Sequence, residues 1–288
     1  MPIEARRVLL PGGADVSYLC SGKRDGRAAP VVMLHGLGGS AAVWKRNLPA
    51  LRGRQRFAPE LWGPGRFAPG APLSVDLGVR FVLDFMEALS ISSAHLIGGS
   101  LGGLIAAMAA LRTPSRVRSL TLIASAGLGR QIAWSQRLMT LPGVGEFFFR
   151  PTEQRVRALL KLLLRTSAPP EDLVAELWAA RSGHDVTRQM LSALRAGVGL
   201  RGVKRSAMLS PYLDGLATPT LVCWGSNDPL FPIEQARTAV ERMPNARLAV
   251  FEGAGHWPFY EQADAFNAAL LDHVRHAEAA RPPTGATG

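Results

Sequence analysis

The sequence is poor in cysteine and contains no long apolar run. Only Cys20 and Cys223 occur among its 288 residues. Two cysteines are too few for a disulfide framework, and each lies in an apolar stretch where a reduced thiol packs as a small hydrophobic residue. The longest nearly uncharged apolar stretch, residues 101–111, is far below the roughly 20 residues of a membrane-spanning helix. Because the first residues also lack the pattern of a secretory signal, we expect a cytoplasmic protein that is not integral to a membrane.

Acidic residues are scarce relative to basic ones. The chain has 33 Lys and Arg but 22 Asp and Glu, a net charge of +11. Thirteen of the basic residues and only six acidic ones lie between positions 130 and 205, where they alternate with apolar residues at helical spacing. No nucleic-acid-binding fingerprint is present. We interpret the excess as solvated faces of cationic helices and expect no nucleic-acid partner. Whether this segment binds anionic substrates or surfaces stays open.

Hydrophobic residues make up 47% of the chain, enough for a sizeable core. Short apolar runs alternate with helical patterns, which is typical of an α/β protein whose mostly parallel sheet is covered by helices on both faces. The runs at residues 6–10 and 14–20 flank Pro11-Gly12-Gly13 and predict an antiparallel hairpin. Further strands are predicted at residues 31–34, 55–59, 95–98, 120–124, 220–224 and 248–251, and helices at residues 74–89, 101–111, 233–243 and 261–274.

One interval, residues 129–211, breaks this alternation. It contains no convincing strand, only helical patterns such as residues 152–165 and 170–181. We therefore predict an inserted helical subdomain that interrupts a core formed by residues 1–128 and 212–278. The final stretch, residues 279–288, is a polar tail rich in Pro and Gly that buries too little surface to become ordered.

A serine lies in a glycine-rich turn between a predicted strand and a predicted helix. The sequence GGSLGG occupies residues 98–103. A sharp turn from strand to helix needs glycine, and Gly98 and Gly102 leave room for it. The start of the helix then places backbone N–H groups and the positive end of its dipole beside the Ser100 hydroxyl. The pattern predicts Ser100 as the nucleophile of an acyl-transfer reaction.

A serine nucleophile needs a base, and the base needs an acid that orients it. His256 lies in the sequence GAGHWP, between the last predicted strand and the last helix, and Asp228 lies in WGSNDP, directly after the strand at 220–224. Loops at the carboxyl ends of parallel strands converge on one crevice. We therefore expect Ser100, His256 and Asp228 to meet there as a catalytic triad.

Other acids and histidines fit these roles less well. No carboxylate follows the strand at 120–124, and Glu252 stands only four residues before His256. His35 precedes a glycine and is predicted to order a loop. Core or surface positions are predicted for the remaining histidines, which are His95, His184, His273 and His276. No pair of His, Cys or carboxylate residues has the spacing of a zinc site, so no metal is expected.

The loop after the strand at 31–34 has two interpretations. In the first, the backbone N–H of Leu37 joins that of Leu101 to form an oxyanion hole. In the second, the sequence GLGGSA at residues 36–41, with Glu60 further along, is a passable dinucleotide fingerprint. The second interpretation leaves the ordered set of serine, aspartate and histidine unexplained. The first is therefore preferred, and no cofactor is expected.

Jointly, these features resemble the α/β-hydrolase family over about residues 8–274. The resemblance rests on the opening hairpin, the His35-Gly36 pair, the serine turn and the chain order Ser, Asp, His. It implies an eight-stranded, mostly parallel sheet and makes residues 129–211 the lid over the active site. Residues 59–66 depart from the Asp and G-x-G-x-S turn that is usual in related sequences. The largest apolar residues of the lid would partly wall the substrate pocket: Trp134, Phe147, Phe148, Phe149 and Trp178.

The resemblance implies a serine hydrolase without naming its substrate. Serine at position 100 argues against dehalogenases and epoxide hydrolases, which use a carboxylate nucleophile. The sequence around His256 is similar both to esterases and to hydrolases of meta-cleavage products. The latter typically carry Gly-Pro-Gly after the His-Gly pair, whereas this chain has LGGS at residues 37–40. We therefore expect hydrolysis of small carboxylic esters through an acyl-enzyme. The alternatives are a carbon-carbon bond hydrolase of meta-cleavage-type diketones, a dinucleotide-binding oxidoreductase and a non-catalytic binder.

Overall fold

The computed structural model describes residues 2–23, 28–61 and 74–280. Eight strands form a single sheet in the order β1-β2-β4-β3-β5-β6-β9-β10. Strand β2 is antiparallel to both of its neighbours, and the other neighbouring pairs are parallel. The predicted hairpin and the mostly parallel sheet are therefore confirmed. The strands are β1 (Glu4–Leu9), β2 (Asp15–Ser21), β3 (Val31–Leu34), β4 (Arg56–Pro59), β5 (Ala94–Gly99), β6 (Val117–Ile123), β9 (Thr220–Gly225) and β10 (Ala246–Phe251).

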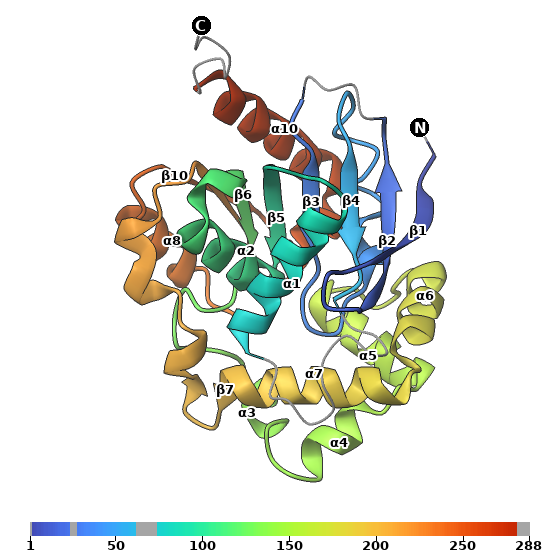
Figure 1. Cartoon of the computed structure of the whole chain (residues 1–288). Helices are drawn as coiled ribbons and strands as arrows, with labels where there is room; N and C mark the ends of the chain where they lie inside the picture. The colour runs from blue at the N-terminus through green and yellow to red at the C-terminus, as the bar shows by residue number, and fades with distance from the viewer. Residues whose placement is uncertain (1, 24–27, 62–73, 281–288) are drawn as a thin grey trace, which may run out of the picture.

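Helices cover both faces of this sheet (Figure 1). Helices α1 and α2 pack together, and α2 lies against β5 and β6, whereas α10 packs against β6 and β9. Two clusters of buried apolar side chains form the core. Continuous apolar strands such as β3 and β9 are buried along their whole length, as expected for strands covered on both faces. The flanking helices are α1 (Val75–Ala88), α2 (Leu101–Arg112), α8 (Glu234–Arg242), α9 (Pro258–Glu261) and α10 (Ala263–Ala279).

The last helix differs from its prediction. A single helix was expected at residues 261–274, but the chain forms a short α9 and a longer α10, separated at Gln262. Gln262 has φ −121° and ψ 53°, which is outside the helical region. Short 3-10 helices also connect the larger elements: η1 (Ala41–Trp44), η2 (Pro114–Arg116), η3 (Arg205–Ala207) and η4 (Ser210–Gly215).

Five α-helices lie between β6 and β9 in the sequence and gather at one end of the sheet (Figure 1). We call this segment the insertion. Thr152 caps one of its helices, as predicted, because its side chain accepts a hydrogen bond from the backbone N–H of Arg155. The prediction of no strand here was wrong, because a short antiparallel pair forms at its end. The elements are α3 (Trp134–Leu138), α4 (Val144–Phe149), α5 (Glu153–Leu163), α6 (Glu171–Arg181), α7 (His184–Gly197), β7 (Val198–Gly199) and β8 (Gly202–Val203).

Some sequence-based predictions fall outside the described residues. They are the departure from the family pattern at 62–66 and most of the tail, residues 281–288. The division into a core of residues 1–128 and 212–278 and a lid of residues 129–211 stays a prediction. Both cysteines are buried free thiols, as expected. Among the helices of the described ranges, none is both long and apolar enough to cross a membrane.

Candidate active site

Ser100 occupies a strained turn between β5 and α2. Its backbone has φ 54° and ψ −117°, in the left-handed half of the Ramachandran map, where residues other than glycine are uncommon. The turn is held by its own main chain, because the Ser100 N–H donates to Ile123 O at 2.8 Å and the Ser100 carbonyl accepts from Gly103 and Ala126. The serine side chain is therefore lifted from the carboxyl end of the sheet.

The positions around this turn require glycine, because a Cβ atom there would lie too close to neighbouring atoms. A Cβ on Gly98 would lie 2.3 Å from the carbonyl oxygen of Gly102, and a Cβ on Gly102 would lie 2.3 Å from that of Leu34. A Cβ on Gly36 would lie 2.9 Å from the Cβ of Ser100. These distances are all shorter than a normal contact, so the chain packs backbone against backbone at this point.

Asp228 and His256 are brought together, as predicted. The Asp228 Oδ2 lies 2.9 Å from His256 Nδ1, and both side chains are buried. The other carboxylate oxygen accepts hydrogen bonds from the backbone N–H groups of Leu230 and Phe231. Since a carboxylate only accepts, the proton of a neutral His256 lies on Nδ1, and Nε2 keeps a free lone pair. The rival acid Glu252 is exposed.

The loop that carries His256 is held on both sides. The His256 N–H donates to Leu163 O, at the end of α5, at 2.8 Å. Glu261 accepts hydrogen bonds from the N–H groups of Gly255 at 2.9 Å and Trp257 at 3.3 Å, the two residues that flank the histidine. Burial raises the pKa of the Glu261 carboxyl. Sequence reasoning gave Glu261 no role, and its position five residues after a candidate base was the available signal.

Ser100 and His256 line the same cavity, which has a volume of about 350 Å³. Leu37 and Leu101 line it as well, as the predicted oxyanion hole requires. Leu101 is the first residue of α2, so its N–H has no partner within the helix and lies at the positive end of the dipole. Among the described residues, the Ser100 hydroxyl makes no hydrogen bond to His256. Such catalytic bonds often tighten only when a substrate binds.

His35 orders the loop after β3, as predicted. Its Nε2 accepts a hydrogen bond from the backbone N–H of Leu61, so its Nδ1 carries the proton and donates to Gly36 O at 2.9 Å. Glu60 accepts a hydrogen bond from the N–H of Ala41 at the far end of the loop. The carboxylate that completed the dinucleotide fingerprint is thus hydrogen-bonded within the loop.

The insertion supplies much of the cavity wall, although not with all of the expected residues. Phe148 and Phe149 line the cavity. The expectation was wrong for Trp134, Phe147 and Trp178, which do not line it and are exposed. Helices α5 and α7 add aliphatic side chains at helical spacing to this wall: Ala158, Leu159, Leu162, Leu163, Ala193 and Leu194.

An arginine that the sequence analysis did not single out also lines this cavity. Arg181 is only 6% exposed, and within the described residues its guanidinium has no hydrogen bond or ion pair. Burial lowers its pKa to about 10, so it stays charged at neutral pH. A Cβ on Gly38 would lie 3.7 Å from Arg181 Nη1, which places the guanidinium beside the loop after β3. Its position on the buried stripe of α6, after Leu173 and Leu177 at intervals of four, was the signal.

The remaining histidines lie elsewhere. His95 bonds Ser119, and His273 donates to the carbonyl of Leu120, so both are buried structural residues, whereas His276 is exposed. The side chain of His184 lies outside the description. In the described part of the chain, no three His, Cys, Asp or Glu side chains are grouped as metal ligands.

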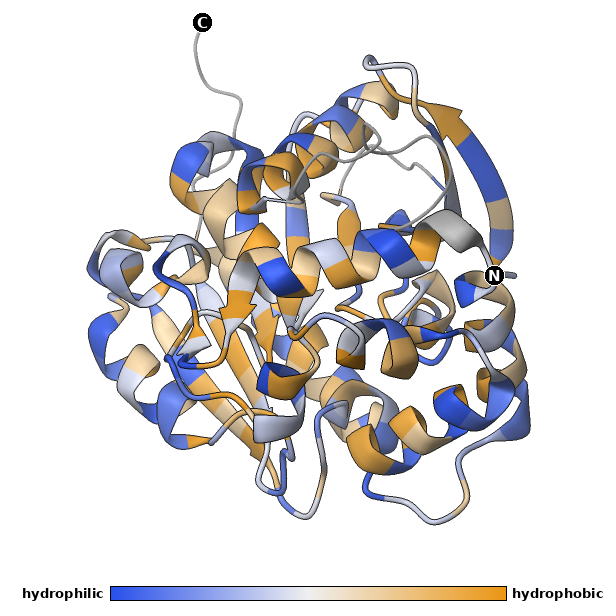
Figure 2. Ribbon diagram, turned by 90° about the horizontal axis from the view of Figure 1, so that it is seen from below, coloured by the Kyte–Doolittle hydropathy of each residue, from blue (hydrophilic) through white to orange (hydrophobic). Residues whose placement is uncertain are grey.

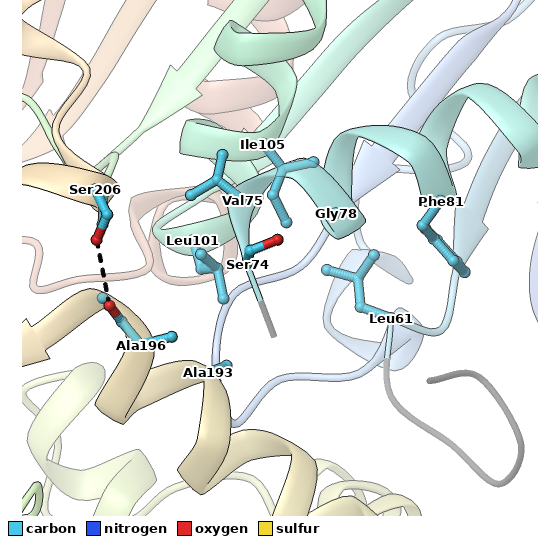
Figure 3. Close-up of a pocket in the computed structure, with 12 residues that line it drawn as sticks. Leu61, Ser74, Val75, Gly78, Phe81, Leu101, Ile105, Ala193, Ala196 and Ser206 are labelled. Carbon is cyan, nitrogen blue, oxygen red and sulfur yellow. Dashed lines mark hydrogen bonds between the residues drawn. The ribbon is translucent and has the colours of Figure 1, made fainter. Parts of the chain in front are cut away.

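A second cavity, of about 110 Å³, lies between α1 and the end of α7 (Figure 3). Its wall includes Val75, Phe81 and Ile105, and one of its few polar groups, the Ser206 hydroxyl, donates to Ala196 O. None of its lining residues within the described ranges has a titratable side chain. Those residues therefore offer no acid, base or cation for chemistry.

A sharply turned serine at the carboxyl edge of a mostly parallel sheet, with an Asp-His pair in the neighbouring loops, defines a class of hydrolytic enzymes. The family model described as the alpha/beta hydrolase fold matches residues 29–263. The chain belongs to this family, and the resemblance inferred from its motifs is confirmed.

Named relatives fall into two groups. The chain is 30% identical to a 2-hydroxy-6-oxononadienedioate/2-hydroxy-6-oxononatrienedioate hydrolase of Comamonas testosteroni, over 86% of this chain and 88% of that one. It is similar in structure to a meta-cleavage product hydrolase from Pseudomonas fluorescens IP01, with TM-score 0.77, 25% identity and coverage of 94% and 98%. A carboxylesterase from Bacillus subtilis shares the fold, with TM-score 0.74, 21% identity and coverage of 95% and 92%.

Proposed function

We propose that this α/β hydrolase is a serine hydrolase that cleaves a carbon-carbon bond next to a ketone, in a small and mostly apolar substrate that carries a carboxylate. The observation that carries this proposal is Arg181, a buried cation that has no partner among the described residues, in a cavity whose wall is mostly apolar apart from a second arginine, Arg155. An uncompensated buried charge is costly, so it favours a ligand of opposite charge. Relatives named as hydrolases of oxo-dienoates and oxo-dienedioates act on molecules of this kind.

In the proposed mechanism, His256 Nε2 takes the proton of Ser100 as Oγ attacks the ketone carbon. Asp228 holds the imidazole through Nδ1 and stabilises the imidazolium. The N–H groups of Leu37 and Leu101 bind the oxyanion. When the carbon-carbon bond breaks, its electron pair goes to the leaving carbon, which receives the proton from His256. Water then attacks the acyl group on Ser100, and His256 serves as base again.

Ester hydrolysis, the activity expected from the sequence, is the second candidate. It uses the same residues, with the proton of His256 going to the leaving alcohol instead of a carbon atom. The sequence LGGS at residues 37–40, in place of the Gly-Pro-Gly typical of meta-cleavage product hydrolases, favours it. Arg181, which lies beside this loop, would then favour esters that carry an acidic group.

We also propose that residues 129–211 act as the lid of this site. The hydrogen bond from the His256 N–H to Leu163 O ties the end of α5 to the catalytic loop. This contact supports a lid that is anchored at α5, because moving α5 away would break the hydrogen bond of the His256 backbone N–H.

The test compares three substrates with purified protein: a keto-diene carboxylate of the meta-cleavage type, its methyl ester at the carboxylate, and p-nitrophenyl acetate. We expect the highest kcat/KM for the keto acid. Arg181→Met should lower it by about 100-fold, the value of a charge-assisted hydrogen bond, and should leave the methylated substrate almost unaffected. Arg181→Lys is the matched control that keeps the charge. Faster turnover of p-nitrophenyl acetate would favour the esterase, and failure of an organophosphonate to label Ser100 would overturn both.

A further inference from the structure

Exposed apolar side chains gather on one part of the insertion. Trp134 is 66%, Phe147 53% and Phe148 49% exposed, and Leu138 and Leu200 are similarly open. These five are most of the large hydrophobic side chains that are exposed in the described residues. Single exposed apolar residues are ordinary, but a group of them marks an interaction surface. We call Trp134, Leu138, Phe147, Phe148 and Leu200 the tip patch.

The tip patch is formed by elements that lie side by side. Trp134 and Leu138 are four residues apart on α3, so they share one helix face. Helix α3 contacts β7, and the N–H of Val203 in β8 donates to Arg130 O just before α3. The rings of Phe147 and Phe148 in α4 contact each other edge to face. Figure 1 shows α3, α4 and β7 together at the end of the molecule that is farthest from the C-terminus.

The described charged side chains around the tip patch are mostly positive. The Arg137 guanidinium lies 4.5 Å from the ring centre of Trp134, and that of Arg155 lies 4.3 Å from the ring of Phe147. The acidic residue of this region, Glu146, is paired with Arg195 at 2.8 Å. Figure 2 views the molecule from the insertion side and shows hydrophobic and hydrophilic stretches along the helices there. Further exposed cations border the patch, namely Arg130, Arg150, Arg201 and Lys204.

The tip patch adjoins the catalytic cavity. Phe148 lines the cavity and is also half exposed, so it stands where the cavity approaches the surface. Gln136 of α3 and Met139, which directly follows α3, line the same cavity. One thin layer of helix thus separates the exposed patch from the space above Ser100.

We propose that the tip patch docks on the surface of an anionic lipid bilayer. Trp, Phe and Leu among Arg and Lys match such a surface, because the rings enter the headgroup region while the cations bind anionic headgroups. A second copy would bring the same positive charge to the contact and be repelled. A protein partner would need acidic residues to match the cations of the patch. A mostly apolar substrate that partitions into the headgroup region would then meet the cavity where Phe148 lies. The proposal does not depend on which bond the enzyme cleaves.

The test is sedimentation of the full-length protein with vesicles. One set contains phosphatidylcholine alone, and the other contains phosphatidylcholine with phosphatidylglycerol. We expect binding to the anionic set that weakens by at least about 10-fold between low and high salt, because exposed charges are screened. The double variant Trp134→Ser with Phe147→Ser should weaken that binding by at least about 10-fold. Neither residue lines the cavity, so turnover of a soluble substrate should be unchanged, which also shows that the variant folds.

Two matched variants sharpen this test. Arg137→Gln with Arg201→Gln should reduce binding to anionic vesicles by about 10-fold or more, since each charge near such a surface is worth about 1 kcal/mol. Tyr212→Ser removes an equally exposed aromatic residue of η4, outside the patch, and should change nothing. Absence of vesicle binding would overturn the proposal. So would equal binding to both sets, or a dimer that dissociates in the serine double variant.

Discussion

The carboxyl edge of the sheet and the insertion face each other across one cavity, but different contacts place their side chains. At the sheet edge, backbone packs on backbone, and positions such as Gly98 and Gly102 have no room even for a methyl group. In the insertion, side chains such as Arg181 and Phe148 border free space. This difference leads us to expect different functions for the two regions. We therefore expect the edge, which carries the candidate catalytic residues, to tolerate little change. We expect the insertion, which lines much of the cavity, to tolerate substitution and to influence which molecule is bound.

The largest effect on activity should come from replacing the candidate nucleophile, Ser100. Ser100→Ala is expected to lower kcat by about 10⁴-fold or more, because no other group can form the acyl-enzyme. Stability should stay close to wild type, since alanine keeps the Cβ. Single-turnover kinetics and thermal unfolding of the same sample measure both quantities. A variant with near wild-type kcat would remove Ser100 from the mechanism.

The tight packing of the sheet edge predicts the next largest effect. Gly102→Ala places a Cβ 2.3 Å from Leu34 O, so strand and helix must separate. We expect a loss of more than about 3 kcal/mol in the free energy of unfolding, at the upper end of overpacking effects. Gly183→Ala in the insertion meets only a side-chain methyl, of Val186, at 3.3 Å and is the matched control. Urea unfolding compares the two, and equal losses would contradict the proposed contrast.

Acid should lower the free energy of unfolding through His273. Burial lowers the pKa of this histidine to about 4. Because the unfolded chain binds the proton near pH 6.5 and the folded chain does not, stability is complete above that pH and falls as the pH drops toward 4. Between pH 7 and 5 the expected loss is about 2 kcal/mol. His273→Gln can keep the hydrogen bond to Leu120 without titrating, so its unfolding midpoint in urea should depend less on pH. An unchanged pH dependence would exclude His273 as the source.

A variant of Glu261 tests whether the loop that carries His256 is as sensitive to substitution as the carboxyl edge of the sheet. Glu261→Gln replaces one acceptor oxygen by an NH₂ group that cannot accept from the amides of Gly255 and Trp257. We expect kcat to fall by about 10-fold with little change in KM, because the hydrogen bonds that position His256 are weakened while the cavity is not. Steady-state kinetics on one substrate is sufficient. A change confined to KM would assign Glu261 to binding instead.

The smallest expected effect is a gain in stability. Arg181→Met removes a buried charge that has no partner in the described ranges of the chain, and it places an apolar side chain of similar length there. The free energy of unfolding should rise by about 1 kcal/mol, while the keto acid is bound less well. Arg157→Met, on the outer side of the insertion with ion pairs to Glu153 and Glu171, is the control and should not gain stability. A loss of stability in Arg181→Met would point to a structural role.

Much of this arrangement could be predicted because it depends on local patterns. The strand runs, the capping residue Thr152 and the turn at Ser100 each carry their signal within a few neighbouring residues. Chain order then placed Asp228 and His256 at the same edge. Trp134, Phe147 and Trp178 were misjudged as cavity residues, because the side of a helix that faces the cavity depends on neighbours distant in sequence. Strands β7 and β8 were missed because two-residue strands leave no periodicity to detect.

The amino-acid sequence alone determined the fold class and the three candidate catalytic residues, because strand and helix periodicity, glycine turns and chain order are local properties. The tertiary structure alone decided what surrounds them. It placed Arg181 in the cavity with no partner from the described part of the chain, Glu261 on the amides beside His256, and Trp134 and Phe147 at the surface. Burial, pairing and exposure are relations between segments far apart in the chain, so only the packed molecule contains them.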